Sequence, residues 1–210
     1  PLRNAISQSH SVSLDGGDER AKYNLGVRYG NDAGVMRGSD RTRLSTNFKL
    51  SYNVSGKFFV SNNATISSVT SNTSPYGDFG TWAQQNPYTA DGELRKSFYH
   101  DIANPLYEAS LGSYGKTNTF EFLNTTNVQI WFGEKYRLDG DFSIDRSKQD
   151  SRRFTSPFSY NEILTKSADQ RGYLDDNWVN TTTYQGKVML SYSDYIFKKL
   201  FLTAMGGSSI

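Results

Sequence analysis

A regular alternation of apolar and polar residues constrains this chain more than any other feature of its sequence. Successive side chains of a β-strand point to opposite faces of the sheet, so a period of two indicates a strand with one apolar and one polar face. Between residues 43 and 54 the apolar set is Leu44, Phe48, Leu50, Tyr52 and Val54, and the polar set is Arg43, Ser45, Asn47, Lys49, Ser51 and Asn53. Because the same pattern recurs along the chain, the sequence predicts an all-β protein.

Short polar connections group the alternating segments into hairpins. Candidate tight turns lie at residues 15–18, 55–57, 133–134 and 193–194, each between two alternating segments. Four such hairpins predict eight antiparallel strands of roughly 9–14 residues, with the last strand running over residues 198–205. Strands of that length exceed the usual five or so residues of globular proteins and suit a tilted membrane crossing.

Long connections alternate strictly with the tight turns. They span residues 31–40, 70–117 and 150–177, so all of them leave the same end of the strands. Outer-membrane barrels have short periplasmic turns at one end and long extracellular loops at the other. Aromatic residues beside the tight turns are typical of an interfacial girdle, here Phe58, Phe59, Trp131, Phe132, Tyr136, Tyr192, Tyr195 and Phe197. The pattern predicts an antiparallel up-and-down transmembrane β-barrel wall, about eight strands of a larger barrel.

Composition agrees with an ordered sheet protein. Aromatic residues make up 14% of the chain, although the mean hydropathy is only −0.64. Barrel strands alternate apolar and polar residues, so a low mean hydropathy does not argue against them. The formal net charge of +2 is small and dispersed, which makes a nucleic-acid partner unexpected.

A soluble or surface-displayed β-sandwich is the alternative interpretation of the same alternation. Such a module would place Leu50, Tyr52 and Leu138 in a closed core, instead of against lipid. It would serve glycan binding or adhesion.

Catalytic and metal-binding patterns are not recognisable in the sequence. The chain has no cysteine, and its two histidines, His10 and His100, lie in separate segments without the spacing of a catalytic triad. Asp139, Asp141 and Asp145 fall at calcium-loop offsets, but Ile144 stands where such a loop needs glycine. We therefore expect neither an enzyme nor a cofactor or metal site.

Several short motifs, in order along nearly the whole chain, resemble the barrel of SusC/RagA-type TonB-dependent transporters. They are His10 to Gly17, Tyr23 to Tyr29, Gly34 to Asp40, Ser74 to Gly77, Asn86 to Tyr88, Asn104 to Leu106 and Phe154 to Pro157. The resemblance implies that residues 1–210 are part of a TonB-dependent receptor barrel domain whose plug and remaining strands are absent here.

The resemblance also implies a function and partners. It implies import of an oligosaccharide or a peptide across the outer membrane of a Gram-negative, Bacteroidota-like bacterium. TonB would supply energy through the missing plug region, and a SusD-like surface lipoprotein would close over the extracellular loops. The barrel itself would contact membrane lipid.

Candidate substrate-binding residues lie in the long connection 70–117, since binding residues concentrate on loops held by a rigid scaffold. Aromatic faces beside amide groups suit sugar rings or peptide side chains. The candidates are Trp82, Asn86, Tyr88 and Tyr99. A polar lumen is expected from polar-face residues such as Lys49, Asn63, Asp139, Asp141 and Lys187.

Overall fold

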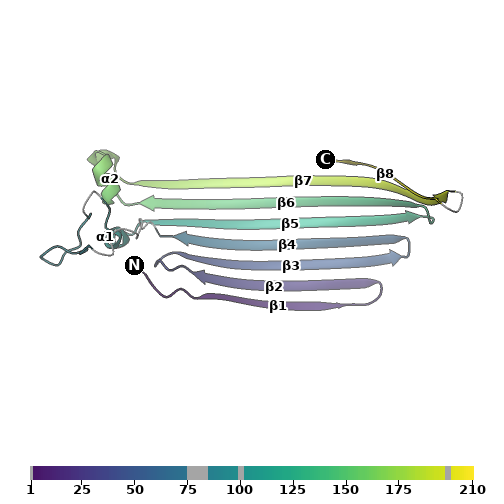
Figure 1. Ribbon diagram of the computed structural model, residues 1–210, viewed down its shortest axis with the longest axis horizontal. Coiled ribbons are helices and arrows are strands. Elements are labelled where there is room, and N and C mark those ends of the chain that lie inside the picture. The colour runs from purple at the N-terminus through teal and green to yellow at the C-terminus, as the bar shows by residue number, and fades with distance from the viewer. Residues whose placement is uncertain (1, 75–84, 99–101, 197–199) are drawn as a thin grey trace.

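A single antiparallel sheet dominates the computed structural model, which describes residues 2–74, 85–98, 102–196 and 200–210. Figure 1 shows the strands side by side in chain order. The strands are β1 (Ser7–Gly17), β2 (Ala21–Ala33), β3 (Asp40–Ser55), β4 (Phe58–Thr73), β5 (Tyr114–Phe132), β6 (Tyr136–Thr155), β7 (Tyr173–Ile196) and β8 (Leu200–Ser209). Every strand pairs antiparallel with the next, which confirms the predicted up-and-down order.

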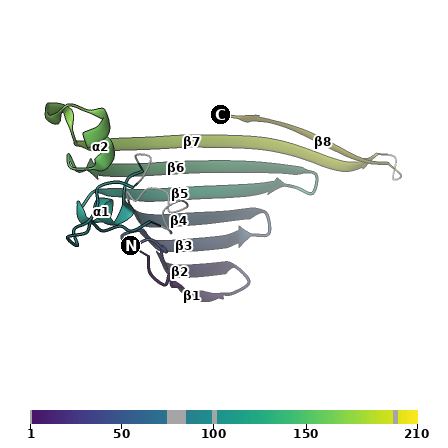
Figure 2. The ribbon, with the colours of Figure 1, turned by 60° about the vertical axis from the view of Figure 1, so that its left-hand side comes forward.

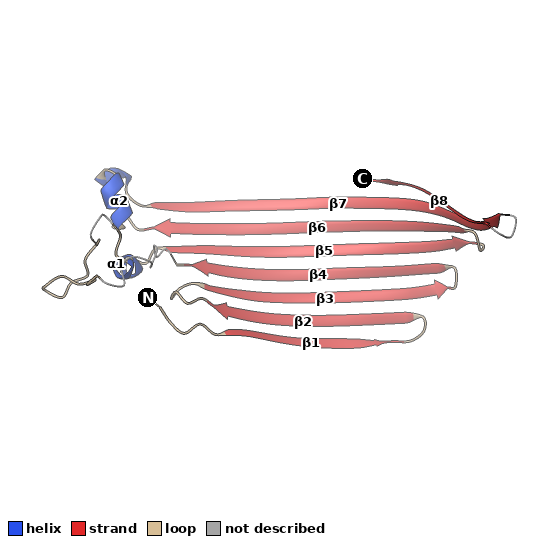
Figure 3. Ribbon diagram, in the orientation of Figure 1, coloured by secondary structure: helices blue, strands red, loops and turns tan. Residues whose placement is uncertain are grey.

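Within the described ranges, helical segments occur only in the long connections. They are α1 (Pro105–Ser110), α2 (Tyr160–Thr165) and a 3₁₀ turn (Ala168–Gln170). Figure 3 shows α1 and α2 at one end of the sheet, with the tight turns of β3–β4 and β5–β6 at the opposite end. The predicted segregation of short and long connections is therefore confirmed.

The strand register brings most of the apolar side chains of β3 to β7 onto one face of the sheet. Residues paired directly across antiparallel strands point to the same face. One row joins Tyr52, Val60, Val128, Gly140 and Val188, and another joins Phe58, Ile130, Leu138 and Leu190. The polar residues expected in the lumen, Lys49, Asn63, Asp139, Asp141 and Lys187, share the opposite face by the same register. We call the two sides the apolar face and the polar face.

The part of the chain that the structure describes contains no second sheet, which the sandwich alternative requires. The described residues form one eight-stranded sheet, so Leu138 and Leu190 meet only as neighbours on one face. Tyr52 and Leu190 are 42% and 48% exposed and Leu138 is half-buried, because no described residue covers this face of the sheet. Figure 2, turned by 60°, likewise shows a single layer of strands.

The strands are longer than the sequence predicts, and several boundaries differ. β5, β6 and β7 contain 19, 20 and 24 residues instead of at most about 14. On β6 the apolar face turns polar beyond Ile144, and the last residues of this strand, 150–155, fall in the long connection that the sequence predicts. The last hairpin is also shifted, since β7 continues to Ile196 and β8 begins at Leu200, so Ser193 and Asp194 are not a turn.

The predicted aromatic girdle is only partly on the apolar face. Phe58, Phe132, Tyr136 and Tyr192 lie there, and the rings of Tyr136 and Tyr192 are 5.0 Å apart. Phe59, Trp131 and Tyr195 fall on the polar face by register, so their assignment to the girdle was wrong. Phe197 lies outside the described residues. Proximity to a turn does not determine the face of a strand residue, whereas its parity does.

The turn between β1 and β2 depends on two residues. Oδ1 of Asp18 accepts backbone hydrogen bonds from Ala21 (2.7 Å) and Arg20 (2.8 Å), and these bonds lower the pKa of its carboxyl group. Gly17 adopts φ 130°, and a Cβ there would lie 2.0 Å from the carbonyl oxygen of Ala21. Glycine is therefore required at this position.

Candidate substrate-facing surface and loop region

The polar face of the sheet carries a network of amide, hydroxyl and carboxylate groups. Asn47 donates to Asn63 Oδ1 (2.9 Å) and to Thr65 Oγ1 (3.0 Å). Further along the same face, Ser61 donates to Asn127 Oδ1 (3.3 Å), and Asn127 donates to Asp141. These bonds cross from β3 to β6 and leave hydrogen-bonding capacity toward the space beside the sheet. Such a surface can hold water and polar solutes.

Ionised groups on the polar face are unevenly distributed. β2 and β3 carry mainly basic residues, namely Lys22, Arg28, Arg41, Arg43 and Lys49, with Asp32 among them. β5 and β6 carry mainly acidic residues, namely Glu121, Asp139, Asp141 and Asp145, with Arg153 and with Arg137, which binds Asp139 at 2.9 Å. A charged solute beside this face would therefore be attracted by one of these two regions and repelled by the other.

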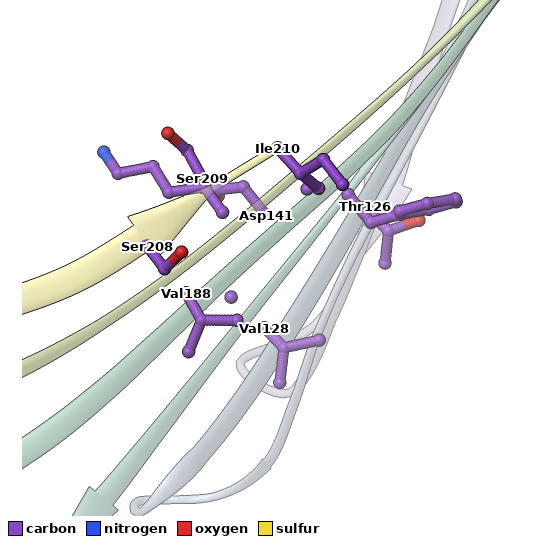
Figure 4. Close-up of a pocket in the computed structure, with 11 residues that line it drawn as sticks. Thr126, Val128, Asp141, Val188, Ser208, Ser209 and Ile210 are labelled. Carbon is purple, nitrogen blue, oxygen red and sulfur yellow. The ribbon is translucent and has the colours of Figure 1, made fainter.

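A hollow of about 450 Å³ lies where β6, β7 and β8 run together (Figure 4). Its floor contains Gly140 and Gly186, whose missing side chains leave space between Val128, Val188 and Ile210. On the other side of the strands a second hollow of about 650 Å³ is lined by polar groups, including Asn127, Asp141, Gln185 and Lys187. The chain's last residue borders both hollows, and we assign neither a ligand.

The loop residues 85–98 and 102–113 are organised by a buried asparagine. Asn104 is completely buried, and its amide group donates to the carbonyl oxygens of Arg95 (2.6 Å) and Pro87 (3.0 Å). Its Oδ1 accepts from the backbone N–H of Leu106 and so caps α1, which begins with Pro105. The sequence signal for this role is an asparagine before a proline at a helix start.

Two of the four predicted substrate-binding residues can be located. Asn86 is exposed, but its Oδ1 accepts from the backbone N–H of Tyr88 at 3.0 Å, which gives it a structural role in a local turn. Tyr88 is 45% exposed, so part of its side chain is accessible. Trp82 and Tyr99 lie outside the described residues. The structure therefore does not test whether the four residues come together.

The two long loops on either side of β5 and β6 are joined by polar contacts that sequence inspection missed. Tyr107 donates to the carbonyl oxygen of Phe158 (3.0 Å), and Glu108 accepts from the backbone N–H of Tyr160 (2.7 Å). Glu108 is buried, so its carboxylate is committed to this contact. Partial burial and the neighbouring charge of Glu108 raise the pKa of Tyr107.

Glu162 anchors the second loop in a similar way. It is buried and binds Lys166 Nζ at 2.9 Å, and its Oε2 accepts from the backbone N–H of Gly172 at 2.8 Å. Both contacts favour the ionised form, Lys166 most strongly, and they lower the pKa of Glu162. The loop end is therefore fastened to the start of β7.

Metal-binding geometry is absent from the described residues, where no three His, Cys, Asp or Glu side chains converge. Asp139, Asp141 and Asp145 follow one face of the extended strand β6 instead of a loop. Across the described ranges no helix has the length and apolarity to span a bilayer.

These features define a class of structure, the wall of an up-and-down β-barrel with one apolar and one polar face. Comparisons with known proteins agree. Over its full length the chain is 24% identical to the TonB-dependent receptor P26 of Formosa agariphila, and it spans 21% of that receptor. A scan against protein families finds no match.

Solved structures show the same fold. The RagAB peptide importer in the closed-closed state matches with a TM-score of 0.75 and 15% identity, over 98% of this chain and 24% of the solved one. The RagAB peptide transporter matches with a TM-score of 0.74 and 15% identity, over 97% and 24% of the two chains. The predicted likeness to SusC/RagA-type transporters is thereby confirmed. The chain spans only about a fifth to a quarter of the proteins that it matches.

Proposed function

We propose that this chain forms part of the wall of an outer-membrane importer for bulky nutrients. The observation that carries the proposal is the division of the whole sheet into one apolar and one polar face, with long loops at one end. Acyl chains would cover the apolar face, and the polar face would line the lumen. The wall needs no covalent chemistry for this task.

Energy and a lid would come from outside these residues. We propose that TonB acts through a plug in the remainder of the protein and that a SusD-like surface lipoprotein closes over the loops. The match to structures of RagAB, a peptide importer, supports a partner of this kind. The loops that carry α1 and α2 would form the contact region on the cell surface.

The imported nutrient is an oligosaccharide or a peptide in this proposal. Trp82, Asn86, Tyr88 and Tyr99 remain the proposed contacts, of which Tyr88 offers a partly accessible side chain. Stacking on an aromatic face supports binding of both sugars and peptide side chains. Uptake by cells with and without the gene, measured with fluorescent oligosaccharides and peptides, would identify the class.

Tyr88→Ala would lower uptake severalfold at unchanged surface level, because it removes the stacking surface. Tyr88→Phe is the matched control, since it keeps the ring and should retain uptake. Equal uptake by both variants and the unmodified protein would remove Tyr88 from the substrate path.

The orientation of the wall is tested with single cysteines in the full-length protein carrying an environment-sensitive probe. Probes at Leu50 and Leu138, on the apolar face, should report lipid. Probes at Lys49 and Asp139, on the polar face, should report water. The reverse pattern would refute the proposed function.

A further inference from the structure

We infer that a cluster of basic residues on the outside of the wall binds phosphorylated lipid headgroups at the outer membrane surface. The cluster consists of Lys116 on β5 and Arg146, Lys148 and Arg152 on β6. We call it the outer basic cluster. The inference rests on the proposed function, because it takes the apolar face as the lipid-facing side.

The register places the outer basic cluster directly beyond the apolar part of that face. Arg146 shares a face with Leu138, Phe142 and Ile144, and it pairs with Phe122. In the strand register Lys148 lies opposite Phe120, and Lys116 lies opposite Arg152, still closer to the loops. In Figure 1 this section of β5 and β6 is toward the end that carries α1 and α2. The cluster therefore begins where the acyl-chain region would end and headgroups would begin.

The charge of the outer basic cluster is only partly balanced. Lys148 pairs with Asp150 at 3.3 Å, and Arg152 pairs with Asp176 at 2.6 Å. Lys116 and Arg146 form no ion pair with any described residue, and Arg146 is exposed. Four basic groups against two acidic groups leave two positive charges on this outward surface.

The surface also has a shape that a headgroup could occupy. A cleft of about 320 Å³ is lined by Lys116, Lys148 and Arg152, by the acidic partners Asp150 and Asp176, and by Trp178 of β7. Trp178 lies opposite Asp150, on the apolar face of the sheet, and is 65% exposed. Tryptophan is enriched at the boundary between acyl chains and headgroups. The position of Trp178 beside the cleft therefore supports placing the cleft at the level of the lipid headgroups.

Lipid phosphates complement this site better than other solutes at that depth. Lys and Arg bind phosphate oxygens through charge-assisted hydrogen bonds, and basic residues near a membrane surface attract anionic lipids by about 1 kcal/mol each. The cleft faces away from the polar face of the sheet, so a solute in the lumen would not reach it.

The test measures binding of a bisphosphorylated lipid A to the full-length protein in nonionic detergent, by native mass spectrometry and titration. Lys116→Ser combined with Arg146→Ser should weaken binding about 30-fold, since two charges are lost. The matched control, Arg153→Ser with Lys187→Ser, removes two charges from the polar face and should leave binding unchanged. Neither pair breaks an ion pair among the described residues.

Further arms separate the possible outcomes. Dephosphorylated lipid A should bind weakly, and millimolar inorganic phosphate should not compete. Competition by phosphate alone, or equal binding by all variants, would overturn the inference. The charge-retaining variant K116R/R146K should bind normally, which distinguishes loss of charge from misfolding. If the Leu138 probe reports lipid while all variants bind alike, only this inference fails, whereas a Leu138 probe in water refutes the proposed function itself.

Discussion

Asn104 joins the two described segments of the β4–β5 connection, residues 85–98 and 102–113. Its fully buried side chain donates to two carbonyl oxygens and accepts from one backbone N–H. Removing the side chain would leave buried groups without partners, at about 1–3 kcal/mol, in addition to about 1 kcal/mol for the lost helix cap.

Asn104→Ala should therefore loosen the loop without unfolding the sheet. Hydrogen exchange at residues 87–98 and 102–108 should accelerate at least tenfold, while exchange in β5 and β6 stays unchanged. Asn31→Ala, which alters an exposed strand residue, is the control. Unchanged protection around α1 would contradict the role given to Asn104.

The Glu162 anchor gives the second loop a pH dependence of defined sign. Its folded pKa is depressed, so its contribution is complete above the ordinary glutamate pKa of about 4.3 and is lost as the pH falls through the lower folded value. A spin label at Leu164, an exposed position on α2, should become mobile in that acidic range. Glu162→Gln should make the label mobile at neutral pH already and abolish the transition. A label that responds identically in both proteins would exclude Glu162 as its cause.

At the scale of secondary-structure elements, the turn of the β1–β2 hairpin contains a glycine that cannot be replaced without strain. At Gly17 a Cβ would collide with the backbone of Ala21, whereas at Gly26 of β2 a Cβ meets nothing within 4 Å. Gly17→Ala should lower the unfolding free energy by about 1–3 kcal/mol, and Gly26→Ala should change it little. Thermal unfolding of the full-length protein in detergent, followed on heated and unheated gels, measures both. Equal midpoints would contradict the strain at Gly17.

The same elements show what the sequence could predict and what it could not. Side-chain parity sufficed for the faces of β3 and β6, because a buried or lipid-covered face tolerates no register slip. It failed for the length of β6, since Arg146 and Lys148 interrupt the apolar pattern while the backbone continues to pair. It also failed for the contacts of Glu108 and Glu162, which join residues far apart in the chain. Asn86 and Tyr88 were singled out by residue type, and type alone could not reveal that Asn86 already serves a turn.

At the scale of the whole molecule, no second layer among the described residues covers either face of the sheet or its two outer strands. β1 and β8 each pair on one side only within the described residues. An open edge with unpaired backbone groups promotes association with other chains. Residues 1–210 expressed alone should therefore form inclusion bodies or require detergent. A soluble, monodisperse product in plain buffer would contradict the barrel assignment.

The portion of the strand beyond its aliphatic stretch is longer on β6 than on β2. On β2 it runs only from Tyr29 to Ala33, but on β6 it runs from Ile144 to Thr155. In a closed barrel this difference would make the extracellular rim lower on the side of β2 than on the side of β6. In the proposed importer, a nutrient from outside the cell would then enter at an angle, over the side of the rim formed by the shorter strands and toward the longer strands.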